Sequence, residues 1–256
     1  MRGLSAPHHV PAAVLVTLLA GAYAVARLPL AGPHGPGAAL LLAVSLTCAT
    51  ALLLALTARL AAASVGDRAL AACGAAAALL AWTIRHRGVQ GPAFELGFDV
   101  ALVVAAAAVG RLFVNQVLEA WWIVPLGLTG ACADFISVFM PGAPTYEMVE
   151  SGSPVLEYLL LVWPNFRAGP APGFVGVSDF VIAAILYAHG ARFSFDGWRT
   201  FRLLWAALVA CLVLAGAWGL GLPAIPFLFV FYVGGHRKAL YESFKARPVS
   251  PRAPGS

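Results

Sequence analysis

Eight long apolar runs, separated by short segments rich in Gly, Pro and charged residues, constrain the fold of this chain more than any other feature. A helix crosses the hydrocarbon core of a bilayer with about 20 apolar residues, so each run is a candidate membrane-spanning helix. The runs cover residues 10–30, 37–62, 68–84, 95–114, 119–140, 173–190, 200–219 and 222–235. The sequence therefore predicts an all-α membrane protein, a polytopic helical bundle of about eight transmembrane helices.

The composition excludes a water-soluble domain. Hydrophobic residues make up 61% of the chain and charged residues 11%, whereas soluble domains have about 45–50% and about 25%. The net charge of +5 includes no long basic run, so we expect a lipid bilayer and no nucleic acid as partner. We divide the chain into a three-helix membrane region (1–92), a membrane core (93–235) and a disordered basic tail (236–256), and the oligomeric state stays open.

The first apolar run allows two interpretations. Arg2, the apolar stretch after it and the triplet Ala22-Tyr23-Ala24 resemble a signal peptide with an A-x-A cleavage site. The apolar character continues beyond Arg27 to Leu30, which favours a retained helix.

One connection, residues 141–172, is much longer than the others. Connections of this length in compact proteins are usually functional or disordered. The loop contains a short apolar run, Leu-Leu-Leu-Val-Trp at residues 159–163, that ends at Pro164. This run is too short to span a membrane, so we expect an interfacial strand or a re-entrant segment.

The distribution of Lys and Arg predicts the orientation. With eight crossings, twelve of these residues face one side and four face the other. The positive-inside rule then places both termini in the cytoplasm and the loop at residues 141–172 outside, most simply in the plasma membrane.

Two aspartates lie inside predicted spans, where a charged side chain costs about 2.5–3.5 kcal/mol and indicates function by default. Asp134 is in the fifth span and Asp179 is near the start of the sixth. At about 1.5 Å per residue, they lie roughly 9 Å and 7.5 Å from the same membrane face. If the two helices are neighbours, the carboxyls meet in a low dielectric, where both cannot ionise and they share a proton.

A shared-proton pair is the catalytic arrangement of aspartic proteases. One carboxylate takes a proton from the water that attacks the peptide carbonyl, and the protonated partner hydrogen-bonds the carbonyl oxygen. The sequence contains no CxxC, HExxH or GxSxG pattern, so we expect no metal and no organic cofactor.

Three motifs follow each other along the chain: Asp134 within a helix, a Gly-x-x-Asp helix start that ends at Asp179, and Pro-Ala-Ile-Pro at the start of the last span. Their order resembles the presenilin and signal peptide peptidase family of intramembrane aspartyl proteases, whose signatures are YD, GxGD and PALP. The resemblance covers roughly residues 95–235. It implies Asp134 and Asp179 as catalytic residues and Gly176 as the first Gly of GxGD. It further implies a supporting motif, Pro223, Ala224, Ile225 and Pro226, in place of PALP, and an apolar strand around Leu161 and Val162 that pairs with an extended substrate.

The sequence departs from the family pattern at three points. Ala133 stands where the family has Tyr, Ser178 replaces the second Gly of GxGD, and we count eight spans where the family has nine. Ser is small enough to allow close helix approach. The resemblance implies an endopeptidase that cleaves single-span membrane proteins or leftover signal peptides.

Three alternatives stay open: a non-catalytic presenilin-like scaffold, a protease like the prepilin peptidases, and a small proton-coupled transporter. Prepilin peptidases also use two membrane aspartates but leave the Pro-Ala-Ile-Pro motif unexplained. A transporter would be expected to carry a second pair of buried charges related by an internal repeat, and the sequence has no such repeat.

Overall fold

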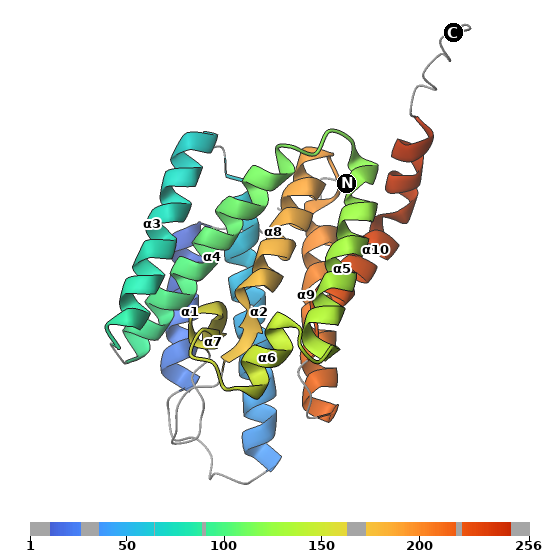
Figure 1. The fold of residues 1–256 in the computed structure, drawn as a ribbon. Helices are drawn as coiled ribbons and strands as arrows, with labels where there is room; N and C mark the ends of the chain where they lie inside the picture. The colour runs from blue at the N-terminus through green and yellow to red at the C-terminus, as the bar shows by residue number, and fades with distance from the viewer. Residues whose placement is uncertain are drawn as a thin grey trace, which may run out of the picture.

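The computed structural model describes residues 11–26, 36–63, 65–88, 91–162, 173–218 and 222–246. These residues form a bundle of helices with a short two-stranded sheet beside it (Figure 1). The helices of the bundle are α1 (Ala12–Ala26), α2 (Pro36–Ala61), α3 (Asp67–His86), α4 (Pro92–Val114), α5 (Ile123–Phe139), α8 (Val177–Arg192), α9 (Gly197–Trp218) and α10 (Ile225–Lys245). The connections contain the 3₁₀ turn η2 (Ala120–Trp122), helices α6 (Pro144–Glu150) and α7 (Leu156–Leu159), and strands β1 (Leu160–Val162) and β2 (Gly173–Gly176).

Each predicted apolar run overlaps one helix of the bundle. Within the described ranges, four helical stretches are long and apolar enough to cross a membrane: Asp67–His86, Ala93–Val114, Ala120–Glu150 and Gly197–Ala215. Shorter apolar helical stretches cover Ala12–Ala22 and Thr47–Ala61. The structure thus indicates a mostly helical membrane protein, and the number of eight crossings stays a prediction.

The sixth run does not begin as a helix. Gly173–Gly176 forms β2, which pairs antiparallel with β1, and α8 begins at Val177. The register places Leu160 opposite Gly176 and Leu161 opposite Val175. Of the two possibilities for the apolar run in the long loop, the structure has a strand, while Trp163 and Pro164 lie outside the described residues.

The prediction of a disordered tail from residue 236 is wrong for its first ten residues, because α10 continues to Lys245. The basic composition conceals an apolar stripe at helical spacing. Tyr232, His236 and Leu240 follow each other at intervals of four residues and are all buried. Residues 247–256 lie outside the described part of the chain.

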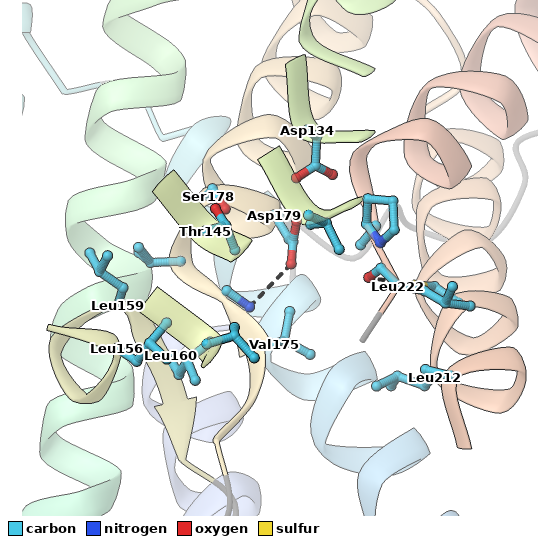
Figure 2. A pocket seen from close by; sticks show the side chains of 18 of the residues that line it. Asp134, Thr145, Leu156, Leu159, Leu160, Val175, Ser178, Asp179, Leu212 and Leu222 are labelled. Atoms are coloured by element: carbon cyan, nitrogen blue, oxygen red, sulfur yellow. Dashed lines mark hydrogen bonds between the residues drawn. The ribbon is translucent and has the colours of Figure 1, made fainter. Parts of the chain in front are cut away.

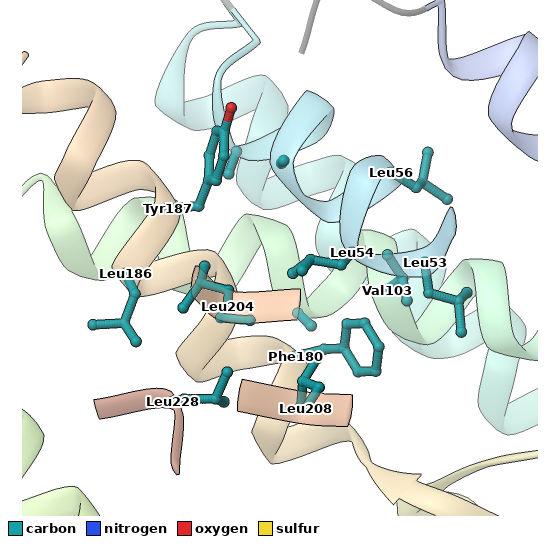
Figure 3. Packing of buried hydrophobic residues seen from close by; sticks show 14 of the residues in the cluster. Leu53, Leu54, Leu56, Val103, Phe180, Leu186, Tyr187, Leu204, Leu208 and Leu228 are labelled. Carbon is teal, nitrogen blue, oxygen red and sulfur yellow. The ribbon is translucent and has the colours of Figure 1, made fainter. Parts of the chain in front are cut away.

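Helix α8 lies at the centre of the bundle and contacts α4, α2 and α9. Ten of its sixteen residues are buried. Its Phe180 and Leu186 belong to the same apolar cluster as Leu53 of α2 and Leu204 of α9 (Figure 3). Asp179 is therefore carried by a helix that is mostly buried in the bundle.

Candidate active site

Asp134 projects from α5 toward the start of α10. Its Oδ2 accepts a hydrogen bond of 3.1 Å from the backbone N–H of Ile225. The first N–H groups of a helix have no partner within the helix, and Pro226 has no N–H to donate. Asp134 therefore satisfies an end group of α10 and ties the Pro-Ala-Ile-Pro motif to α5.

Asp179 is the third residue of α8 and is 9% exposed. Its Oδ2 accepts a hydrogen bond of 3.1 Å from the N–H of Gly176. A carboxylate at this position that binds the residue before the helix is one half of a capping box. This bond explains why α8 begins at Val177. Among the described residues, the second carboxylate oxygen of Asp179 accepts no hydrogen bond.

Gly176 fits the site because it has no side chain. A Cβ at this position would lie 3.1 Å from Ser178 Oγ and 3.3 Å from Asp179 Oδ2. These distances are tighter than most real Cβ contacts, so a larger residue would displace the groups around Asp179.

Both aspartates line one cavity of about 330 Å³. In Figure 2 the carboxyl of Asp134 points toward the part of the cavity that holds Asp179, and leucines from several elements line the rest. The lining residues are Asp134, Val138, Thr145, Met148, Val149, Leu156, Leu159, Leu160, Val175, Gly176, Val177, Ser178, Asp179, Leu208, Cys211, Leu212, Ala215, Leu222, Pro223 and Ala224.

Most of the residues predicted for the site meet at this cavity. The lining includes Asp134, Asp179, Gly176, Ser178, Pro223 and Ala224, and Ile225 contributes its N–H. Pro226 is not part of the lining.

The strand residues are placed differently from the prediction. Leu161 is fully buried in the apolar core, and Leu160 lines the cavity in its place. Neighbouring residues of a strand face opposite sides, so the strand offers alternate residues to the cavity. For Val162 the structure describes only the backbone, which belongs to β1.

Sequence reasoning missed the walls contributed by α6 and α9. Thr145 and Met148 of α6 and Leu208, Cys211 and Leu212 of α9 line the cavity. Thr145 Oγ1 also lies 2.6 Å from Ser137 Oγ, one turn beyond Asp134, which ties α6 to α5. The leucines of α9 have the spacing of ordinary core residues, so no sequence signal separates them from the core.

The arrangement combines two carboxyls with a cavity lined mostly by apolar side chains. Two carboxylates in a low dielectric share a proton, which allows one to act as base and the other as hydrogen-bond donor. Within the described residues no group of three or more His, Cys, Asp or Glu could hold a metal ion. No protein-family model, curated protein or solved structure matches this chain.

Proposed function

We propose that this chain is an intramembrane aspartic endopeptidase of the presenilin and signal peptide peptidase type, with Asp134 and Asp179 as the catalytic pair. The observation that carries the proposal is that two aspartates from different helices line one apolar cavity. Each carboxylate also accepts a backbone N–H at 3.1 Å, which fixes its orientation. Fixed, oriented catalytic groups lower the entropy cost of reaching the transition state.

In the proposed mechanism the pair holds one proton between two carboxyls. The ionised carboxyl takes a proton from a water molecule, the resulting hydroxide attacks the scissile carbonyl carbon, and the protonated carboxyl donates a hydrogen bond to the carbonyl oxygen. The tetrahedral intermediate then collapses, and the leaving amine takes a proton from the pair. Neither carboxyl alone can act as both base and acid.

The apolar lining supports a substrate class. Leu156, Leu159 and Leu160 face the cavity from one side and Leu212 and Leu222 from the other (Figure 2). Such walls favour unfolded apolar segments, so the substrates are single-span membrane proteins or leftover signal peptides. β1 pairs with β2 on one edge, and its other edge suits the addition of an extended substrate strand.

The proposal includes the membrane placement. The chain crosses the plasma membrane about eight times, with both termini in the cytoplasm and the loop at residues 141–172 outside. Because an active site of fixed orientation accepts one chain polarity, substrates are spans of type II orientation.

The decisive experiment reconstitutes the purified protein with a panel of single-span peptides and follows cleavage by mass spectrometry. We expect Asp134→Asn and Asp179→Asn each to abolish cleavage while the helical content is kept. Asp196→Asn is the matched control, because Asp196 is exposed and caps α9 through Arg199, and Asn caps a helix as well as Asp. If Asp134→Asn or Asp179→Asn cleaves the peptides as fast as Asp196→Asn does, the two aspartates are not a catalytic pair.

The same preparation separates the protease from the scaffold and transporter alternatives. A scaffold would bind the peptides without cleaving them. A proton-coupled transporter would acidify the lumen of proteoliposomes in an aspartate-dependent way without peptide products. Cleavage that requires both aspartates supports the protease and excludes the other two.

Orientation is tested with single cysteines at Ser151 and Ser250 in a background without the native Cys48, Cys73, Cys132 and Cys211. Intact cells are labelled with an impermeant thiol reagent. We expect labelling at position 151 and none at position 250. The opposite pattern would reverse the orientation and the substrate polarity and would leave the catalytic assignment unchanged.

A further inference from the structure

A second cavity lies at the opposite end of α8 from Asp179. It has a volume of about 360 Å³ and is lined by Ala61, Ala62, Ala63, Arg111, Val114, Asn115, Ala188, Ala191 and Arg192. Asp179 and Arg192 are thirteen residues apart on one helix, so the two cavities are separated by about 20 Å. This cavity is therefore independent of the aspartate pair.

Two arginines are the charged residues that line this cavity in the described part of the chain. Arg192 Nη1 donates a 2.8 Å hydrogen bond to the carbonyl of Val114, at the end of α4. Arg111 Nη2 donates a 3.0 Å hydrogen bond to the carbonyl of Val65, in the connection before α3. These bonds hold both guanidinium groups at the cavity and use a small part of the five N–H donors on each.

Arg111 has a donor that its surroundings do not satisfy. Its Nη1 is buried and has no hydrogen-bond partner among the described residues. A buried unpaired donor on a charged group is unfavourable, and each such group needs a physical explanation. An anion bound in the cavity would explain this donor, because after a small movement of the guanidinium it could accept a hydrogen bond from Nη1.

No described carboxylate is ion-paired with either arginine. Asp67 does not line the cavity, but its Oδ1 accepts a 2.8 Å hydrogen bond from Nδ2 of Asn115, which does. The place of the two arginines in the last turns of α4 and α8 suits the helix dipoles, but this does not explain why both border one cavity.

We propose that this cavity binds a phosphate group, supplied by the headgroup of an anionic phospholipid or by free phosphate. The planar guanidinium matches phosphate oxygens with two parallel hydrogen bonds. The cavity lies where the ends of α2, α4 and α8 meet, and basic pockets between membrane helices bind anionic headgroups. The two arginines leave the site with a net positive charge even when the nearby Asp67 is counted, so an anionic lipid is favoured over a zwitterionic one.

The test measures lipid binding to the purified full-length protein in detergent by native mass spectrometry. One arm adds phosphatidylglycerol, a second adds phosphatidylcholine, and a third adds inorganic phosphate in competition with phosphatidylglycerol. We expect saturable binding of phosphatidylglycerol in preference to phosphatidylcholine. Arg111→Gln and Arg192→Gln should each weaken this binding about tenfold or more, the usual effect of removing a hydrogen bond to a charged group.

Arg68→Gln is the matched control, because Arg68 is exposed at the start of α3 and does not line the cavity. Competition by inorganic phosphate would identify free phosphate as a source, and its absence would identify the lipid. Equal binding of the two lipids by the wild type, or an equal loss in Arg68→Gln, would overturn the proposal. If the Gln variants do not fold, Arg192→Lys is used instead, because it keeps the positive charge and loses the planar guanidinium that makes two parallel hydrogen bonds. This variant should bind phosphatidylglycerol several-fold more weakly. Unchanged binding would also overturn the proposal.

Discussion

The two helices that carry the aspartates are held in the bundle in different ways. In α8, ten of sixteen residues are buried, and the helix contacts α4, α2 and α9. In α5, the buried residues are Ile123 and Ala131, and the helix packs mainly against α10, with further contacts to α6 and η2. One member of the pair is thus fixed in the core, while the position of the other depends on α10.

The glycine contacts of the two helices show the same difference. Gly110 of α4 lies against the backbone of α8, where a Cβ would come within 2.6 Å of Ala184 Cβ and 2.8 Å of the nitrogen of Ile185. Gly127 of α5 lies against the ring of Phe229 in α10, where a Cβ would come within 2.2 Å of Cδ2. A backbone cannot move aside locally, whereas a ring can rotate.

The largest expected effect concerns activity and tests whether the two helices act as one site. A coupled pair of carboxyls titrates in two macroscopic steps, so cleavage should fall on both the acid and the alkaline side of a maximum. The measurement is kcat/KM for a single-span peptide between about pH 4 and pH 9, the range in which perturbed carboxyls titrate. A flat profile would contradict a shared proton.

Gly110→Ala should cost the most stability, about 1–3 kcal/mol, because overpacking at a backbone contact forces α4 and α8 apart. Thermal unfolding in detergent measures the loss. Gly97→Ala, in the same helix, is the control, because its Cβ would meet Ile84 at an ordinary 3.7 Å. Equal melting temperatures for the two variants would show that the contact of α4 with α8 is not close.

Tyr232→Phe should cost about 1–2 kcal/mol, because it removes one hydrogen-bond partner of a buried histidine. His189 Nδ1 lies 2.7 Å from the hydroxyl of Tyr232, and its Nε2 lies 2.9 Å from the carbonyl of Ala120. The Nε2–H therefore donates to the carbonyl, and the tyrosine hydroxyl donates to Nδ1. This cluster joins α8, α10 and the turn before α5, so a wild-type melting temperature in Tyr232→Phe would contradict its role as a tie.

Gly127→Ala should reduce stability by less than about 1 kcal/mol, because the ring of Phe229 can rotate. It should reduce cleavage by about tenfold or more, because α5 moves with Asp134 and a small misplacement of a catalytic group is costly. Gly130→Ala is the matched control in the same helix, since its Cβ would lie 3.8 Å from Ile225. If both variants cleave equally, the position of α5 does not limit the reaction.

The smallest effect is expected at the loop that covers the cavity. Arg85 Nη2 lies 3.4 Å from Glu157 Oε2, and Glu157 belongs to α7, whose leucines line the cavity. Both side chains are partly exposed, so Glu157→Gln should cost less than about 1 kcal/mol. The substitution leaves Arg85 in place over the ring of Phe98. A larger loss of unfolding free energy, measured by thermal unfolding, would mean that the ion pair holds α7 in place.

The candidate site was only partly predictable from the sequence. Charge in an apolar run identifies Asp134 and Asp179 because a buried carboxylate is costly wherever the helices pack. Which of Leu160 and Leu161 faces the cavity could not be predicted in this way, because a shift of one residue in strand register exchanges the two faces of the strand. The register of β1 with β2 places Leu160 in the cavity and Leu161 in the core.

The helix limits show a similar division. Hydrophobic runs located every helix of the bundle, but they misplaced the start of α8 and the end of α10. β2 interrupts an apolar run because it pairs with β1, a partner distant in the chain. α10 extends through a charged segment because His236 and Leu240 are buried on its inner face.

The sequence by itself determined that this chain is mostly apolar helix and that two aspartates lie within it, because both follow from the cost of placing polar groups in an apolar environment. Tertiary structure alone decided that α5 packs against α10 and that Asp134 accepts a hydrogen bond from the N–H of Ile225. It also decided that α6 and α9 line the rest of the cavity. These contacts depend on the rotation and neighbours of each helix. A helix that is apolar on all sides carries no periodic signal from which its neighbours could be inferred.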